Sequence, residues 1–444
     1  MKKVLIYTMC LLLIIPVHYA SEDVVSISYK MLNYAIAVDE KSAIELMDDE
    51  LAAQLKGKLA PVFIQLKMFG GEYKGAKGEK QYEKAGFKVV EIGMDFSKMK
   101  FVQRTAFNDE GKMTGLVYTP GVIVETEVLP ENLKEENISF YADEKYPIDG
   151  KITTPKEGEI LAGIVLVHGS GPHDMDETIG INKPFADLAY GLASNGFAVL
   201  RYDKRTLTHG AEMTKSEDYA YLTIDEETAD DAAAAVEFLS EKLGGNEKVF
   251  LLGHSMGAML ASYIGSKTDN IDGYILMAGT PQKLWQLVIE QNERALNEME
   301  EKPENMQQYI KTEEIKARKL ADLSDEEALK EENSVFGMPA WYLRHMDNID
   351  AVTLHMQDMK PVLVLQGEKD RQVTMKDYEL FKQGLKEHKD AKFISYPTLN
   401  HIFGEYKGEE VPFMELMNKE YMQKTPIPKE VIDDIAAWIS ERLF

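Results

Sequence analysis

Cysteine is almost absent from this 444-residue chain. The only one, Cys10, lies in a hydrophobic segment near the N-terminus. If that segment is removed, no cysteine remains, which excludes disulfides, thiolate metal sites and a cysteine nucleophile. Basic residues are also scarce, with 50 Lys and Arg against 75 Asp and Glu and a formal net charge of −25. So acidic a chain is repelled by nucleic acids and anionic membranes, and we expect neither as a partner. Clustered metal ligands are missing as well, and we expect neither a metal nor a cofactor.

Long apolar runs are missing too, and the main candidate is too short to be a comfortable permanent membrane span. This segment, from Val4 to Val17, follows Lys2-Lys3 and precedes Ala20. A charged region, a hydrophobic region and a small residue follow one another here. This order predicts a secretory signal peptide over residues 1–20, cleaved near Ala20. We therefore expect a secreted or otherwise extracytoplasmic protein without a stable membrane span. An uncleaved signal anchor is the alternative.

The remaining chain is long enough for two domains, and its pattern changes between them. Residues 24–122 begin with helical spacing and continue with alternating strand-like runs, which predicts a small α+β domain. Residues 123–140 are acidic and contain Pro130, which predicts a linker. From 141 to 444, strands alternate with helices, as is typical of a mostly parallel sheet covered on both faces. Between about 281 and 358 no strand fits, which predicts a helical lid, or alternatively an extended surface hairpin.

The most informative motif is Gly253-His254-Ser255-Met256-Gly257, which directly follows the apolar run Val249–Leu252. In a nucleophile elbow, a serine occupies a cramped turn between a strand and a helix, and the two glycines let the backbones pass closely. The next residues, from Ala258 onward, are small and apolar and suit a buried helix. Ser255 is therefore the predicted nucleophile, although a serine in a simple glycine-rich turn would match the pentapeptide alone.

A serine nucleophile needs a histidine base and a carboxylate that orients the histidine. In this fold class the acid and the base follow the serine in that order. Asp370 follows an apolar strand-like run and His401 follows the next one, so both are expected at the carboxyl ends of strands. Glu368 is an alternative acid, and His388 an alternative base that we expect to be a solvated surface residue.

An oxyanion hole should supply two backbone N–H groups, one from the residue after the nucleophile and one from a loop after an early strand. The first is expected from Met256. The second is expected from the loop His168-Gly169-Ser170-Gly171-Pro172, with the amide of Ser170 as donor.

Residues from about 140 to 444 resemble the α/β-hydrolases of the secreted bacterial serine-esterase type. The first domain resembles the nuclear-transport-factor-2-like accessory domains that precede some of these enzymes. The motifs that carry the hydrolase resemblance are His168 to Pro172 with Asp174 to Thr178, then Asn182-Lys183-Pro184-Phe185, Arg201-Tyr202-Asp203-Lys204-Arg205-Thr206 and the Ser255 elbow. The resemblance implies a carboxylesterase that hydrolyses short-chain, acetyl-like esters, on a small-molecule or carbohydrate-linked substrate. Asp203 and Arg205 are expected to brace loops beside the site, with Arg205 contacting substrate as the alternative.

Two other functions use the same residues. A serine peptidase or aminoacyl hydrolase has the same triad, although the prolyl-oligopeptidase kind would need a propeller for which the first domain is too short. The chain could also be a secreted binding protein with an inert hydrolase domain, but such a scaffold has no need of all three catalytic groups. Neither the natural ester nor the oligomeric state follows from the sequence.

Overall fold

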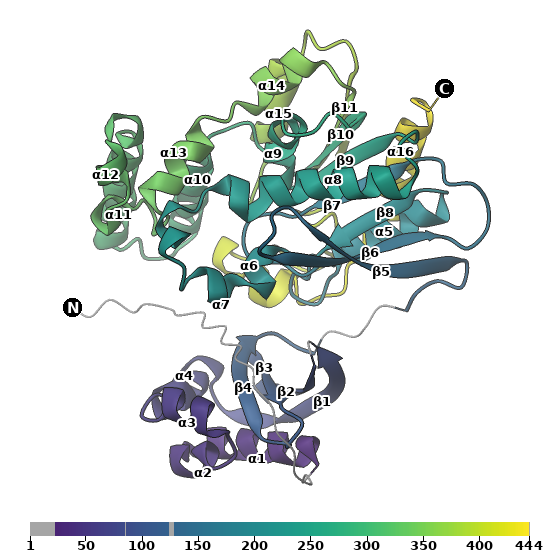
Figure 1. Ribbon diagram of the computed structural model, residues 1–444. Coiled ribbons are helices and arrows are strands. Elements are labelled where there is room, and N and C mark those ends of the chain that lie inside the picture. Colours follow the sequence, from purple (N-terminus) through teal and green to yellow (C-terminus); the bar gives the residue numbers. More distant parts are fainter. Residues whose placement is uncertain (1–22, 85, 124–127, 444) are drawn as a thin grey trace. The chain divides into compact units, whose positions relative to one another are not determined.

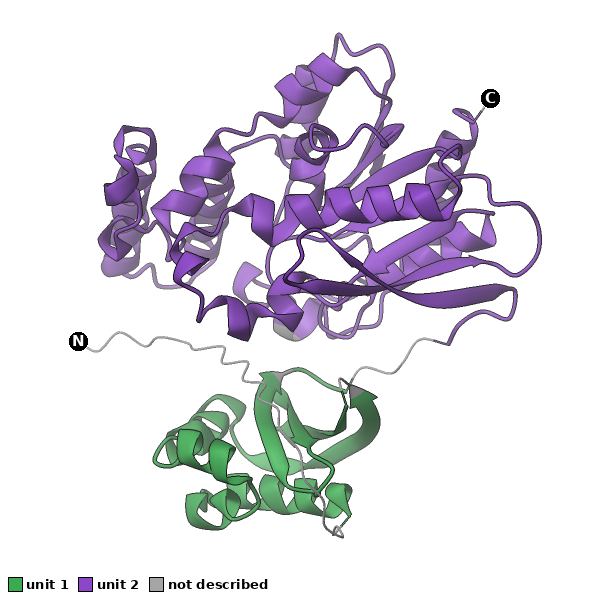
Figure 2. Ribbon diagram, in the orientation of Figure 1, with its two compact units in different colours: residues 1–126 green, residues 127–444 purple. Residues whose placement is uncertain are grey.

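A computed structural model describes residues 23–84, 86–123 and 128–443 of the chain (Figure 1). The chain divides into two compact units, residues 1–126 and residues 127–444 (Figure 2). The predicted signal peptide, residues 1–20, with Cys10, lies outside the described residues. In the described ranges, no helix has both the length and the apolar character needed to cross a membrane.

The first unit packs four helices against an antiparallel sheet of order β1-β2-β3-β4, an α+β arrangement as predicted. Aspartates begin three of the helices, since the side chains of Asp23, Asp39 and Asp48 accept backbone N–H groups of the first turns. The apolar helix faces and one sheet face share a core that includes Met31 and Phe63. The elements are α1 (Val24–Ala37), α2 (Glu40–Ile44), α3 (Asp49–Leu55), α4 (Leu59–Gly70), β1 (Tyr73–Lys84), β2 (Phe87–Phe96), β3 (Lys100–Phe107) and β4 (Met113–Pro120).

The second unit is built on an eight-stranded sheet of order β12-β11-β10-β9-β7-β8-β6-β5. All neighbouring strands from β12 to β8 are parallel, and β6 and β5 add an antiparallel edge. The central strands are buried along their whole length because helices cover both faces, which explains their continuous apolar runs. The strands are β5 (Leu133–Tyr141), β6 (Pro147–Pro155), β7 (Gly163–Val167), β8 (Ala198–Tyr202), β9 (Val249–His254), β10 (Gly273–Met277), β11 (Val362–Gly367) and β12 (Ala391–Tyr396).

Helices on the two faces of this sheet enclose separate apolar cores. On one face the core includes Leu239, Leu260 and Phe381, and on the other it includes Leu188 and Trp438. The helices of the first face are α8 (Asp230–Lys242), α9 (Met256–Gly265) and α15 (Met375–Gly384), and those of the second are α5 (Pro184–Ser194) and α16 (Lys429–Ser440). This arrangement confirms the predicted mostly parallel sheet covered by helices.

The predicted linker over 123–140 is wrong in its second half. Residues Leu133–Tyr141 form strand β5, which pairs antiparallel with β6 from Leu133↔Pro155 to Tyr141↔Pro147. The two acidic residues of this edge strand, Glu135 and Glu136, are both paired, Glu135 with Lys151 and Arg201 and Glu136 with Lys242. A strand can carry such charges because its pairing satisfies the backbone and the partners neutralise the carboxylates.

The segment between β10 and β11 is helical throughout the region where the lid was predicted. Its helices have a core of their own, which includes Trp285, Ile310 and Leu343. They are α10 (Leu284–Asn297), α11 (Glu304–Ala317), α12 (Asp325–Ala328), α13 (Ala340–Asp347) and α14 (Ala351–Asp358). Of these, α13 and α14 also reach the main core through Met346 and Ala351.

Candidate active site

Four loops at the carboxyl edge of the sheet bring the predicted site residues into one region. His168 follows β7, Ser255 follows β9, Asp370 lies three residues beyond β11, and His401 lies five residues beyond β12. In parallel sheets, ligands bind at the carboxyl ends of the strands. The three residues of the predicted triad therefore follow three parallel strands and lie at the same edge of the sheet.

Ser255 occupies the turn between β9 and α9 in a strained backbone conformation, with φ 53 and ψ −113. Its N–H donates to the carbonyl of Met277 at 2.8 Å, which fixes the turn against β10. A Cβ atom on Gly253 would stand 2.3 Å from the backbone of Gly257, and one on Gly257 would stand 2.2 Å from the Val167 oxygen. Both glycines are therefore required by close backbone packing, as the elbow motif predicts.

Asp370 and His401 form a buried pair. The Nδ1 atom of His401 is 2.8 Å from Oδ2 of Asp370, and each residue is only 5% exposed. Asp370 also accepts hydrogen bonds from the side chain of Gln366 and from the backbone N–H groups of Gln372 and Val373. An ionised carboxylate only accepts hydrogen bonds, so Nδ1 of His401 donates and Nε2 keeps the lone pair that a base needs.

The neighbour of Ser255 connects the elbow to His401. His254 Nε2 lies 2.9 Å from the carbonyl oxygen of His401, and the two imidazole rings are 4.8 Å apart between centroids. Among the described residues, no hydrogen bond joins Ser255 Oγ to His401. Catalytic hydrogen bonds often tighten only when substrate is bound, so this geometry is compatible with a serine–histidine pair.

The alternative acid and base lie elsewhere. Glu368 is exposed and accepts a hydrogen bond from Ser395 Oγ. His388 precedes β12, at the opposite edge of the sheet from His401. The expectation that His388 is a solvated surface residue is wrong, because it is 7% exposed and its Nδ1 accepts the N–H of Asp390. It is buried because the chain folds back there into β12.

The loop after β7 lies directly against the nucleophile. A Cβ atom on Gly169 would stand 3.2 Å from Cβ of Ser255, so a larger residue there would push against the nucleophile. The N–H of Gly169 is already bonded to Glu177 Oε1 at 2.7 Å. By contrast, the N–H groups of Ser170 and Met256 have no acceptor among the described residues. These are the two predicted oxyanion donors, and both remain available for a ligand oxygen.

A buried ion pair that the sequence analysis did not identify lies behind the elbow. Glu177 is fully buried with φ 49, and its Oε2 is 2.9 Å from Nδ1 of His254. Burial alone would raise the pKa of Glu177, but the facing His254 overcomes this and brings the pKa to about 2. Burial likewise opposes the charge on His254, and Glu177 raises its pKa nonetheless. Both nitrogens of His254 face acceptors, so the surroundings favour the doubly protonated ring.

A second missed group links the β7 loop to the helical insertion. Lys204, which is 1% exposed, donates to the carbonyl of Gly169 at 3.2 Å and to Glu227 Oε1 at 3.0 Å. The hydroxyl of Tyr342, on α13, donates to the other oxygen of Glu227 at 2.7 Å and lies 4.0 Å from the sulfur of Met256. These contacts join residues that are far apart in the chain, so they cannot be predicted from a local sequence pattern.

Asp203 and Arg205 hold loops together, as expected. Asp203 accepts the N–H of Met175 at 2.7 Å, and Arg205 pairs with Asp231 and Asp143. Arg205 is 2% exposed. Its partners occupy the guanidinium, which favours bracing over contact with substrate.

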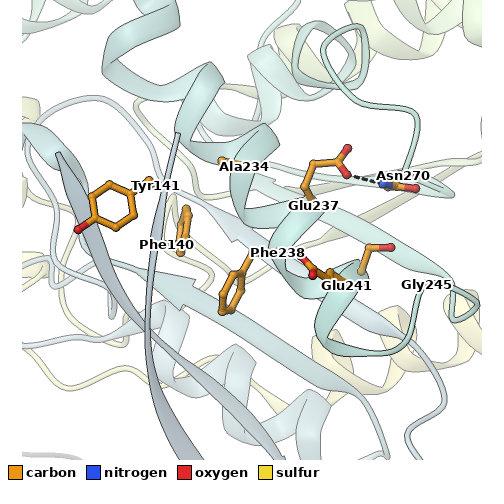
Figure 3. A pocket seen from close by; sticks show the side chains of 9 residues that line it. Phe140, Tyr141, Ala234, Glu237, Phe238, Glu241, Gly245 and Asn270 are labelled. Atoms are coloured by element: carbon orange, nitrogen blue, oxygen red, sulfur yellow. Dashed lines mark hydrogen bonds between the residues drawn. The ribbon is translucent and has the colours of Figure 1, made fainter. Parts of the chain in front are cut away.

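A surface groove of about 620 Å³ between β5 and α8 contains none of the predicted site residues. Phe140 stacks on Phe238 there, and Glu237 is bonded to Asn270 (Figure 3). Glu237 and Asn270 of its lining therefore already have structural partners. Across the described ranges, no group of three or more His, Cys, Asp and Glu side chains is arranged to hold a metal ion.

Comparisons with known proteins find a hydrolase family and several esterases that are similar to this chain. The sequence profile of the Hydrolase_4 family, described as serine aminopeptidase, S33, matches residues 158–405, a range that includes Ser255, Asp370 and His401. Esterase EstD of Thermotoga maritima is 31% identical over 409 residues, covering 90% of this chain and 91% of its own. The Pyrococcus furiosus esterase Pf2001 has a TM-score of 0.44 and 13% identity, over 72% of this chain and 96% of that one. Est1E from Butyrivibrio proteoclasticus has a TM-score of 0.42 and 16% identity, over 68% and 99% of the two chains.

Gly257→Ala should destabilise the second unit, because the new methyl would meet the Val167 oxygen at 2.2 Å and force the backbones apart. We expect a loss of about 3 kcal/mol in the free energy of unfolding, measured by denaturant titration. Gly210→Ala is the matched control: a Cβ there meets nothing within 4 Å, and the change should be near neutral or slightly stabilising. Equal effects of the two substitutions would contradict the close-packing argument.

Glu177→Gln should destabilise the protein in a pH-dependent way. The Glu177–His254 pair is fully charged above the ordinary Glu value of 4.5 and below the ordinary His value of 6.5. In that window we expect a loss of about 3–5 kcal/mol relative to wild type. The pKa of His254 is raised by folding, so its contribution is lost as pH rises through the folded value, and the difference between variant and wild type should shrink.

The control for this measurement is Glu135→Gln, because Glu135 is paired with Arg201 and Lys151 rather than with a histidine. Its stability difference should stay constant as pH rises from neutral to about 9, where arginine and lysine remain charged. Thermal or denaturant unfolding at several pH values tests both variants. A pH-independent effect of Glu177→Gln would count against a charged pair.

Proposed function

This chain belongs to the Hydrolase_4 family of α/β-hydrolases and is a serine hydrolase, and we propose that it acts as a carboxylesterase on short-chain acyl esters. The observation that carries the proposal is the buried Asp370–His401 pair at 2.8 Å, placed beside the Ser255 elbow and two unbonded backbone N–H groups. Acyl transfer needs these groups and no others. The similarity to a protein named as an esterase supports ester rather than peptide hydrolysis.

In the proposed mechanism, Ser255 Oγ attacks the ester carbonyl carbon while Nε2 of His401 takes its proton. Asp370 holds the imidazole in the required tautomer and stabilises its charged form. The N–H groups of Ser170 and Met256 bind the developing oxyanion. When the tetrahedral intermediate collapses, the C–O bond to the alcohol breaks, and His401 returns the proton to that oxygen.

In the second half of the proposed reaction, water takes the place of Ser255 as the nucleophile, and His401 and the two N–H groups act as before. His401 removes a proton from a water molecule, whose oxygen attacks the acyl-enzyme carbonyl carbon. The intermediate again places its oxyanion at Ser170 and Met256. Collapse releases the carboxylic acid and returns the proton to Ser255.

A serine aminopeptidase activity is the second candidate, because the family description names it. An aminopeptidase must bind the free ammonium group of its substrate, which requires an available carboxylate or polar cluster. The two carboxylates described beside the site, the buried Glu177 and the partly buried Glu227, are already paired with His254 and Lys204. This pairing favours the esterase.

The purified protein should hydrolyse p-nitrophenyl acetate or butyrate, and a fluorophosphonate should label Ser255. Ser255→Ala should lower kcat at least about 10,000-fold, and Asp370→Asn should lower it by a similar order, because the histidine loses its orienting acceptor. Circular dichroism should show that both variants remain folded. Well-folded wild-type protein with no labelling and no ester hydrolysis would overturn the proposal, and faster release of aminoacyl reporters than of esters would favour the peptidase.

The natural substrate is proposed to be a small-molecule or carbohydrate-linked ester. The helical insertion between β10 and β11 is the proposed lid, and it would then set the acyl-chain length that the site accepts. A panel of acyl chains from acetyl to decanoyl, together with acetylated sugars, distinguishes the substrate classes.

We also propose that the protein is exported and that its first unit is an accessory domain of the nuclear-transport-factor-2-like type. Export is supported by the charged and hydrophobic order of residues 1–20, which ends in Ala20. Mass spectrometry of the protein from its native cells should find a mature chain that begins close after Ala20. A chain that retains Met1 to Ala20 would contradict cleavage.

A further inference from the structure

In the peptide group between Gly169 and Ser170, the C=O group is hydrogen-bonded within the described part of the protein and the N–H group is not. Its carbonyl oxygen accepts a hydrogen bond from Nζ of Lys204 at 3.2 Å, while its N–H, on Ser170, has no acceptor among the described residues. In a planar trans peptide the C=O and N–H point in opposite directions. Fixing the carbonyl therefore fixes the direction of the N–H, which is the proposed oxyanion donor.

Lys204 is unusual because it is a lysine that is almost completely buried. It is 1% exposed, and a buried ammonium group is costly unless it is paired. The pairing is with Glu227 at 3.0 Å, which lies in the π-helix Asp225–Ala229 at the start of α8. Buried ion pairs add little to stability compared with apolar packing, and π-helical turns are frequent at functional sites. A role in the site explains both features.

The same group of residues approaches the other proposed donor. Tyr342 of α13 donates to Glu227 at 2.7 Å and contacts the sulfur of Met256 at 4.0 Å. On the far side, Glu177 holds the N–H of Gly169 at 2.7 Å. Gly169 is thus fixed through its N–H by an anion and through its carbonyl by a cation.

We infer that Lys204 is a positioning residue of the oxyanion hole: its ammonium group orients and polarises the Gly169–Ser170 peptide, and Glu227 and Tyr342 connect it to helix α13 of the insertion. A cation at the carbonyl draws electron density through the peptide and makes the N–H a stronger donor. The benefit grows with negative charge on the ligand oxygen, so it acts on the transition state more than on bound substrate. The inference rests on the proposed esterase activity of the same site.

The experiment uses the full-length protein with p-nitrophenyl butyrate as substrate and a boronic acid as tetrahedral transition-state analogue. Lys204→Met alone leaves Glu227 unpaired, so Lys204→Met combined with Glu227→Gln removes both charges. Lys267→Met is the matched control, because Lys267 pairs with Asp225 and Asp230 of the same turn at 3.0 and 2.9 Å and does not contact Gly169.

The double variant should lower kcat by about 10-fold to 100-fold, a part of the loss seen when an oxyanion donor is removed outright. KM should change by less than about 3-fold, and the Ki of the boronic acid should rise by the factor by which kcat/KM falls. Lys267→Met should leave kcat and Ki within about 2-fold of wild type. If Lys204 had a purely structural role, the double variant would have a lower melting temperature, and the rise in the Ki of the boronic acid would not match the fall in kcat/KM.

Tyr342→Phe tests the connection to α13. Loss of its hydroxyl should lower kcat by about 2-fold to 5-fold, and the loss should disappear in the Lys204→Met, Glu227→Gln background, since the hydroxyl then has no charged pair to hold. Full additivity of the two changes would overturn the link between Tyr342 and Lys204.

The central inference is overturned if the folded double variant keeps kcat and the boronic acid Ki within 2-fold of wild type, or if only KM changes. Failure of the proposed function gives a different result, because the wild-type protein would then neither hydrolyse the ester nor react with the fluorophosphonate.

Discussion

The left-handed backbone of Ser255 is the constraint around which the rest of the second unit is arranged. Strand β9 must turn into helix α9 without a connecting loop, and this is possible only if φ at Ser255 is positive and the neighbouring backbones almost touch. The close approach of Gly257 to Val167 and of Gly169 to Ser255 follows from that turn. Strain of this kind persists only where the surroundings determine it, and the buried strands on both sides do so.

Around this turn, the titratable side chains are arranged in hydrogen-bonded pairs. Asp370 faces His401, Glu177 faces His254, and Lys204 faces Glu227. Each of these groups would be costly to bury alone, and each pair holds a different part of the site: the base, the elbow or the β7 loop. A site built in this way keeps its dipoles and N–H groups oriented before substrate arrives, which is the condition for electrostatic stabilisation of a transition state.

Local chemistry explains which parts could be predicted from the sequence. The sequence predicts Ser255 because the elbow needs glycines at fixed positions, and it predicts Asp370 and His401 because strands alternate regularly with helices and each residue follows a strand. Strand β5 was mistaken for a linker, since its pairing with β6 depends on partners that acidic composition does not reveal. The burial of His388 and the contact of Tyr342 with Glu227, 115 residues apart, are tertiary features with no local pattern.

The helical insertion leaves the sheet after β10 and returns at β11, and these two strands are direct neighbours in parallel register, with Tyr274 opposite Val362. Helix α14 packs against the main core and completes the crossover, so the residues between Thr280 and Asp347 form a module whose length does not affect the strand register. The loops that carry Ser255, Asp370 and His401 lie outside this segment, but Gln291 and Tyr342 within it bond to Gln372 and Glu227 next to those loops. Variation in this segment is thus free in length but constrained at α13, where Tyr342 meets the residues beside the elbow.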